Sequence, residues 1–249
     1  MAAPHVALRG VRKVFAGVER SAAVDALGPL DLELARGEFF AVVGPSGSVE
    51  FEGRPIGTSV PDGVGVVFQE DASLPWLDVS ANIAFGLRHA PLPAAEKDAR
   101  VKRALEMMGL VDFAASYPAQ LSGGMRQRVC IARTLVTEPR LILLDEPFGA
   151  LDQQTRLLMG DELLRLWRAT GATVFLITHA LDEAAMLADR IGVMSSRPGR
   201  FLDLVATGWP HERDSRIVEQ PSFGTVTARL WKTLREESRK ALGTRPPVA

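Results

Sequence analysis

Side chains able to bind a cation or handle a proton follow three apolar runs of this sequence. Asp145 and Glu146 come directly after residues 141–144, and Gln69 and His179 each follow another such run. Parallel sheets place their chemistry just past the carboxyl ends of their strands, so we expect these side chains at one sheet edge. Together they could hold Mg²⁺, a terminal phosphate and a water molecule. Burying an acid is costly unless it holds a cation or handles a proton, which favours such a task for Asp145. For Asp145 taken alone, a cap on the next turn is an alternative of about equal weight.

A serine and two glycines, Ser122, Gly123 and Gly124, precede the acidic run by about twenty residues. Ser122 can cap the helix that follows. The glycines leave backbone N–H groups uncovered at a helix N-terminus, where the macrodipole favours an anion such as phosphate. A flexible glycine turn before a helix is the alternative, and these residues alone do not decide between the two.

The composition bounds the class of protein. The chain has 249 residues, 47% of them hydrophobic and 24% charged, which suffices for one large globular domain or a domain with a subdomain. A net charge of −1 gives no reason to expect nucleic acid as a partner. With one cysteine no internal disulfide can form, and a reducing compartment is expected. No apolar run approaches the length of a membrane span.

Strand and helix patterns divide the chain into three parts. The run 39–43 is apolar at every position, as in a strand buried on both faces, and 30–34 alternates, as in a strand with one wet face. Residues from about 75 to 136 are mostly helical. We therefore expect an α/β domain over 1–208 with this helical subdomain inserted, followed by a polar, helical tail over 209–249.

Two helices of the inserted part have clear end signals. Asp78 is a good N-cap for a helix over Val79–Leu87, and a helix over Ala94–Met108 ends before Gly109.

In combination these motifs resemble those of the nucleotide-binding subunits of ABC transporters. Residues 121–128 are similar to the family signature, 141–147 to its Walker B strand with the catalytic glutamate, and 149–152 to its D-loop. The match covers nearly all of residues 5–205, and motifs in this order and spacing are very specific. The resemblance implies a P-loop NTPase fold with a mixed central sheet, an antiparallel β-subdomain and the inserted helical subdomain.

The resemblance also implies roles for single residues. Asp145 would hold Mg²⁺, Glu146 would polarise the attacking water, and His179 would contact the γ-phosphate of ATP. Gln69 would sense the Mg²⁺ and pass the signal to the helical subdomain. Phe15 stands where the family keeps an aromatic that stacks on adenine.

Other implied roles concern partners. Such subunits form head-to-tail dimers, in which Ser122, Gly123 and Gly124 would cap the γ-phosphate of ATP held by the opposite subunit, and Asp152 would lie in the D-loop at the dimer contact. The implied partners are a membrane permease, a second ABC subunit in a homo- or heterodimer and, indirectly, a periplasmic substrate-binding protein. The implied location is peripheral, on the cytoplasmic face of the inner membrane.

The sequence departs from the family at the phosphate loop, which should be G-x-x-x-x-G-K-[ST]. The residues that begin this loop are present, namely Gly44, Pro45, Ser46 and Gly47. Val49, Glu50 and Phe51 then stand where the glycine, the lysine and the hydroxyl residue belong. The side chains that neutralise phosphate charge and bind Mg²⁺ are therefore absent.

More than single substitutions is involved, because residues 48–53 already resemble the next strand of the β-subdomain. Roughly twenty residues, the loop end and its helix, are missing relative to a usual βαβ unit. We therefore expect one face of Phe39–Val43 to be partly bare, and a tight, roughly antiparallel turn between Val43 and Val49. An in-frame deletion between two Ser-Gly-Ser repeats, in the gene or only in its reading, would explain the sequence.

Three functions are compatible with these features. The first is the ATP-binding subunit of a bacterial importer, and segments 68–70, 74–77 and 196–200 resemble the subunits for nitrate, sulfonates and taurine. The second is a catalytically impaired subunit that lends its signature to an intact partner. The third is an ABC ATPase of DNA repair or translation, against which stands the absence of a coiled-coil insertion, a second cassette and a basic stripe.

Overall fold

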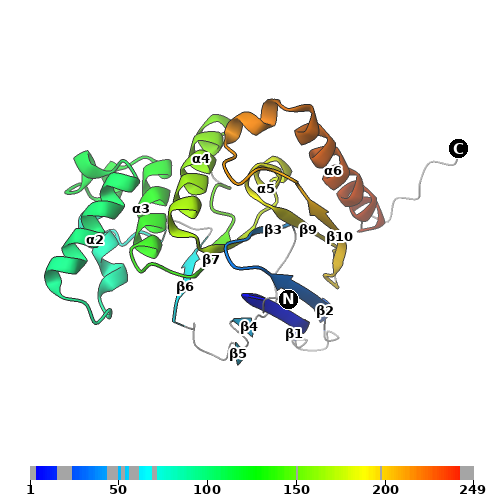
Figure 1. The fold of residues 1–249 in the computed structure, drawn as a ribbon, viewed down its shortest axis with the longest axis horizontal. Helices are drawn as coiled ribbons and strands as arrows, with labels where there is room; N and C mark the ends of the chain where they lie inside the picture. Colours follow the sequence, from blue (N-terminus) through cyan, green and yellow to red (C-terminus); the bar gives the residue numbers. More distant parts are fainter. Residues whose placement is uncertain are drawn as a thin grey trace, which may run out of the picture. The chain divides into compact units, whose positions relative to one another are not determined.

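The computed structural model describes two compact units of the chain (Figure 1). The terminal unit contains Met1–Pro61 and Thr173–Ala249, and the middle unit contains Asp62–Ala172. The described residues are 4–15, 24–43, 50–51, 54–55, 62–68, 72–149, 151–196 and 198–241.

A mixed sheet with strand order β10-β9-β3-β8 forms the core of the terminal unit. Its strands are β3 (Phe39–Val43), β8 (Thr173–Ile177), β9 (Arg190–Met194) and β10 (Phe201–Ala206). β3 is parallel to both of its neighbours, and β10 is antiparallel to β9. The carboxyl ends of β3 and β8 therefore lie side by side, with Val42 opposite Ile177.

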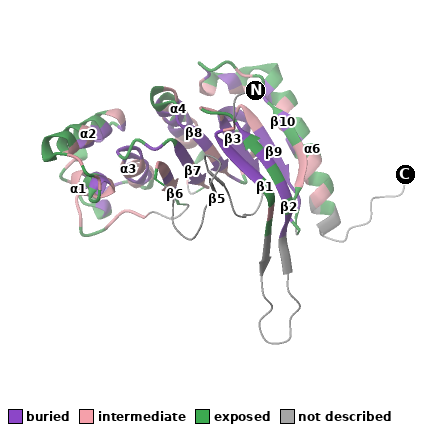
Figure 2. Cartoon of the chain, turned by 60° about the horizontal axis from the view of Figure 1, so that its bottom comes forward, coloured by how far each residue is buried: buried purple, intermediate pink, exposed green. Residues whose placement is uncertain are grey.

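Every residue of β3 is at most 5% exposed, so the expectation of a partly bare face is wrong (Figure 2). The ring of Phe40 packs against Phe175 and Phe201, with centroids 5.7 and 6.2 Å away. The guanidinium of Arg190 lies 5.4 Å from the Phe40 centroid. Helix α5 (Leu181–Leu187) also packs against β3. These neighbours, which come from later parts of the chain, bury the strand.

A second, antiparallel sheet has the strand order β2-β1-β4-β5. Its strands are β1 (Val6–Phe15), β2 (Val24–Leu34), β4 (Glu50–Phe51) and β5 (Arg54–Pro55). The pairing of β4 with β1 confirms that the sequence after residue 48 re-enters a β-subdomain. The turn that we expected between Val43 and Val49 lies outside the described residues.

The segment after residue 208 contributes to the core of the terminal unit. Buried Arg213 donates to the carboxylate of Asp189 at 2.7 Å, and this carboxylate accepts the N–H of Phe39 at 2.8 Å. After the 3₁₀ turn η4 (Ser215–Glu219), helix α6 (Pro221–Ala241) buries Phe223 and Leu230. The start of β3 is thus held by a residue from near the end of the chain.

The middle unit combines two parallel strands with helices. The strands are β6 (Val64–Val67) and β7 (Leu141–Asp145), which pair from Val64 to Val67. Its α-helices are α1 (Val79–Ala84), α2 (Ala94–Met107), α3 (Gly123–Leu135) and α4 (Gln153–Thr170). Short 3₁₀ turns are η1 (Phe85–Leu87), η2 (Val111–Phe113) and η3 (Pro118–Gln120).

Both helix-end predictions in this unit are confirmed. The carboxylate of Asp78 accepts the N–H of Ala81 at 2.7 Å and so caps α1. Gly109, two residues after α2, has a φ of +62°, a conformation that favours glycine. In the described part of the chain, no helix is long and apolar enough to cross a membrane.

Candidate functional site

The acidic pair stands at the carboxyl end of β7 in the middle unit. Leu141, Ile142 and Leu144 are buried, and Asp145 and Glu146 are partly exposed. Glu146 has a φ of +44°, a backbone conformation that a non-glycine residue adopts only where its surroundings impose it. Burial, and next the charge of Glu146, raise the pKa of Asp145 above its ordinary value. A bound cation would offset both effects, so this edge is suited to one.

The turn after the acids is held by packing and by a helix cap. Phe148 is fully buried, and its carbonyl accepts the N–H of Leu151 at 3.0 Å. Asp152 caps α4 by accepting the N–H of Thr155 at 2.9 Å and its hydroxyl at 2.6 Å. The Thr155 hydroxyl, and next the N–H, lower the pKa of Asp152. Asp152 is therefore ionised and fixed in direction at ordinary pH.

The serine and glycines open α3, as the sequence predicts. Ser122 accepts the N–H of Met125 at 3.3 Å, and Ser122 and Gly123 are exposed. A β-carbon on Gly124 would lie 3.5 Å from Cγ2 of Thr155, so the starts of α3 and α4 are neighbours within the middle unit. Uncovered N–H groups at the exposed start of α3 suit an anion that approaches from another molecule.

His179 follows β8 in the terminal unit, and its side chain is exposed. The residue before it, Thr178, is buried, and its N–H donates to the carbonyl of Val42 on β3 at 3.0 Å. The structure therefore places this histidine just past a strand end, as the sequence predicts.

Several predicted site residues lie outside the described part of the chain. They are Gly44, Pro45, Ser46, Gly47 and Gln69. Phe15 is the last residue of β1, but its side chain is not among those described. The roles of all the predicted site residues remain predictions.

Comparison with known proteins identifies the family. The family model described as "ABC transporter" matches residues 45–149. An uncharacterised ABC transporter ATP-binding protein of Methanocaldococcus jannaschii is 38% identical over 238 residues, covering 88% of each chain. The chain belongs to the ATP-binding subunits of ABC transporters. The ABC subunit is also similar to the taurine import ATP-binding protein TauB of Pseudomonas aeruginosa, with 45% identity over 226 residues, 81% of this chain and 85% of that protein.

Solved structures confirm the fold predicted for this ABC subunit. A dimeric ATP-binding cassette in a post-hydrolysis state with ADP and Pi superimposes with a TM-score of 0.67 at 27% identity. The superposition covers 81% of the ABC subunit and 98% of that chain. The α/β fold of P-loop NTPases, with a mixed sheet and an antiparallel one, is thereby established.

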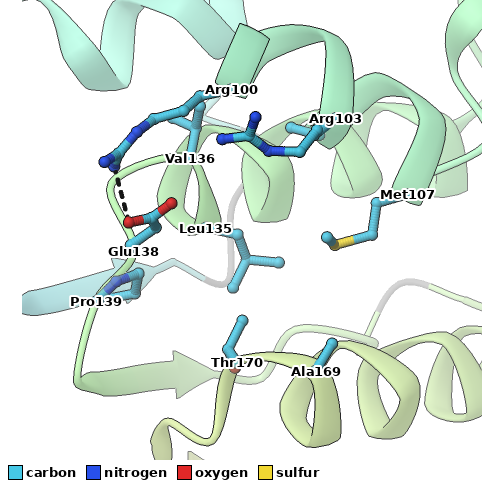
Figure 3. A pocket seen from close by; sticks show the side chains of 10 residues that line it. Arg100, Arg103, Met107, Leu135, Val136, Glu138, Pro139, Ala169 and Thr170 are labelled. Carbon is cyan, nitrogen blue, oxygen red and sulfur yellow. Dashed lines mark ion pairs between the residues drawn. The ribbon is translucent and has the colours of Figure 1, made fainter. Parts of the chain in front are cut away.

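A pocket in the middle unit of the ABC subunit is not the predicted site (Figure 3). It has a volume of about 350 Å³, and an ion pair between Arg100 and Glu138, 3.1 Å long, lies on its wall. Glu138 and Pro139 precede β7, so the pocket is near the amino end of this strand, whereas Asp145 is at its carboxyl end. The pocket therefore does not include the acidic pair.

Two residues that hold the ABC subunit's motifs were not found by sequence reasoning. Thr155 fixes the carboxylate of Asp152, and its place three residues after a capping acid is a signal that could have found it. Glu183 accepts the hydroxyl of Thr178 at 3.0 Å, and an acid in the first turn of a helix gives no such signal. Thr155 contacts Asp152, which has a predicted role, and Glu183 contacts Thr178, which precedes His179.

Proposed function

We propose that this chain is the ATP-binding subunit of a bacterial importer for nitrate, a sulfonate or a taurine-like solute, and that its signature serves ATP held by an intact second ABC subunit. One observation carries the proposal. Ser122 caps the start of α3 and is exposed there together with Gly123, whereas the sequence after Val43 lacks the lysine and the hydroxyl residue of the phosphate loop. The nature of the solute rests on the taurine-import relative and on the sequence resemblance.

The signature can act on an ATP that this chain does not itself bind. The Ser122 hydroxyl oxygen accepts the Met125 N–H, and its proton remains available for a hydrogen bond to a phosphate oxygen. The N–H groups of Gly123 and Gly124 begin a helix of 13 residues, whose dipole favours phosphate. In the proposed complex these groups hold the γ-phosphate of the partner's nucleotide.

The chain's own site does not fit ATP–Mg²⁺ in the same way. Asp145 and Glu146 could hold a cation, but the sequence lacks the phosphate-loop hydroxyl that should share it. We therefore assign no hydrolytic step to this site. Glu146 and His179 follow the ends of strands, as their family roles require, but we assign them no catalytic role in this chain.

Alignment lengths support the view that a segment is missing. The Methanocaldococcus alignment spans 238 positions, but 88% of this chain is about 219 residues, so about 19 positions of the relative face no residue here. The alignment with TauB leaves about 24, because 81% of this chain is about 202 residues against 226 positions. Both numbers agree with the roughly twenty residues expected from the length of a βαβ unit.

Exposed aromatic side chains in the middle unit support a permease partner. Trp76 is 70% exposed, and Phe113 and Tyr117 are also exposed. The N–H of Val79 donates to the carbonyl of Ser116 at 2.9 Å, which ties the start of α1 to the segment that carries Phe113 and Tyr117. Exposed aromatic side chains are enriched at protein interfaces. A permease contact would place the chain on the cytoplasmic face of the inner membrane, with a periplasmic binding protein reached only through the permease.

Calorimetry with ATP–Mg²⁺ tests the impaired site. The purified chain should bind nucleotide weakly or not at all, and Glu146→Gln should change no measurable activity of the chain alone. Submicromolar affinity, or turnover that falls in Glu146→Gln, would refute the assignment. Sequencing the gene across codons 44 to 53 shows whether the gene itself lacks the segment or whether the segment was lost only when the sequence was read.

ATP turnover in a mixture with an intact ABC subunit tests the signature. Turnover by the intact subunit should rise on addition of this chain, and Ser122→Ala combined with Gly123→Asp should abolish the rise. Ser222→Ala, an exposed serine in the first turn of α6, is the matched control and should leave the rise intact. An equal rise with the signature variant would exclude action in trans.

A further inference from the structure

The carboxylate of Glu183 is buried and contacts Thr178, the residue before His179. Glu183 is 3% exposed and Thr178 is 2% exposed, and the Thr178 hydroxyl donates to Oε2 of Glu183 at 3.0 Å. The neighbouring acid of the same helix turn, Asp182, is not buried. The two acids of α5 therefore have different environments, although both stand in its first turn.

Thr178 links three parts of the terminal unit. Its hydroxyl donates its single proton to Glu183, and it accepts the N–H of Ala180 at 3.0 Å. The N–H of Thr178 itself donates to the carbonyl of Val42 at 3.0 Å. Thr178 and Ala180, the residues on either side of His179, are thus held by three hydrogen bonds, and Thr178 takes part in each of them.

The burial of Glu183 needs an explanation beyond helix stability. An acid in the first turn gains from the helix dipole without being buried, as Asp182 does, but taking a carboxylate out of water is costly unless it makes strong hydrogen bonds. The next residues, Ala184 and Ala185, are also buried, and an apolar side chain like theirs at position 183 would avoid the cost of burying a carboxylate. The feature that Glu183 provides and an alanine does not is an acceptor for the Thr178 hydroxyl.

We propose that Glu183 is a positioning residue, which fixes Thr178 and thereby sets the outward orientation of His179 before any nucleotide is bound. With its proton committed to Glu183, the hydroxyl keeps a lone pair directed at the Ala180 N–H, and the turn is locked. The use of this orientation in ATP chemistry rests on the proposed function. The positioning itself does not, because it requires neither nucleotide nor partner.

NMR spectroscopy of the full chain without nucleotide tests this inference, because the sequence contains only four histidines. Glu183→Met fills the same space without an acceptor, and Glu183→Gln keeps one. In Glu183→Met we expect amide exchange at Ala180 to accelerate at least tenfold and the His179 ring signals to broaden or double. Glu183→Gln should stay within twofold of the parent, and Asp182→Asn, which removes a charge from the same turn, should change neither signal.

Two further measurements separate positioning from general loosening. Thr178→Val should reproduce the effect of Glu183→Met, and Thr178→Ser should not. His5 is an internal reference, because its Nδ1 is 2.7 Å from the hydroxyl of Thr173 at the other end of β8. Its signals should stay sharp in every variant. Unchanged His179 signals and Ala180 exchange in Glu183→Met, or equal broadening of His5, would overturn the proposal.

Discussion

Strands β3 and β8 are parallel neighbours in one sheet, and the segments that leave their carboxyl ends differ. After β8, Thr178 is hydrogen-bonded to β3, to Ala180 and to Glu183, and His179 is presented on a fixed turn. After β3 the sequence of the phosphate loop stops at Gly47 and continues as a β-subdomain strand. In the proposed function, one strand end keeps its hydrogen-bonded turn although the sequence after its neighbour lacks the lysine and the hydroxyl residue expected of a phosphate loop.

Restoring the loop is the sharpest way to test this contrast. We expect a chain given the missing segment of the Pseudomonas TauB protein to bind ATP–Mg²⁺ at least about a thousandfold more tightly. A lysine about 4 Å from a phosphate charge contributes about 4 kcal/mol at an effective dielectric of about 20, and each 1.4 kcal/mol is about tenfold. Calorimetry measures the gain, and the same insertion with its lysine changed to alanine is the control. No gain over that control would mean that the rest of the site has been lost as well.

A core substitution tests whether β3 is as well covered as β8. Phe40→Ala should lower the free energy of unfolding by about 3 kcal/mol, because it removes the ring that packs against Phe175 and Phe201. Urea unfolding followed by circular dichroism measures the loss, with Phe68→Ala, an exposed ring, as the control. A cost below about 1 kcal/mol would indicate that β3 is loosely packed after all.

The signature cap gives a smaller effect on stability. Ser122→Ala should lower the free energy of unfolding by about 1 kcal/mol, because the Met125 N–H loses its acceptor, whereas Ser122→Gly should cost only a few tenths. Thermal unfolding of the two variants measures the difference. Equal costs would mean that the cap does not hold the start of α3.

The raised pKa of Asp145 predicts the smallest effect. A carboxyl whose pKa is raised by folding destabilises the folded chain above that pKa, and the penalty disappears as the pH falls below the ordinary value. Asp145→Asn should therefore stabilise the chain at pH 7, by less than about 1 kcal/mol for a partly exposed group, and the gain should vanish near pH 3. Chemical unfolding at several pH values measures it, with exposed Asp112→Asn as the control. A loss of stability at pH 7 would show that Asp145 has a favourable partner.

The sequence predicts those features whose cause is local. The apolar run before Asp145, the caps at Asp78 and Ser122 and the shortened phosphate loop are each determined by a few adjacent residues, and where the structure describes them they are as expected. The fold was predicted from the resemblance of these motifs, in their order and spacing, to those of ABC subunits.

Features that depend on distant residues could not be predicted. The cover of Phe40 comes from Phe175, Arg190 and Phe201, far along the chain, so the missing helix taken alone predicted a bare strand. The role of Glu183 was equally hidden, since a first-turn acid is ordinarily exposed and only the packing of α5 shows that this one is buried.

The division of the chain has a consequence for its synthesis. The middle unit is one continuous stretch, Asp62–Ala172, and can fold as soon as it leaves the ribosome. The terminal unit is split, so β3 must wait for its partners β8 and β9 and finally for Arg213, which holds the carboxylate that accepts the first N–H of β3. A chain that ended at residue 208 would lack Arg213 and the buried Phe223 and Leu230. Until β8 and β9 are made, both edges of β3 stay unpaired during translation, open to proteases and to pairing with other nascent chains.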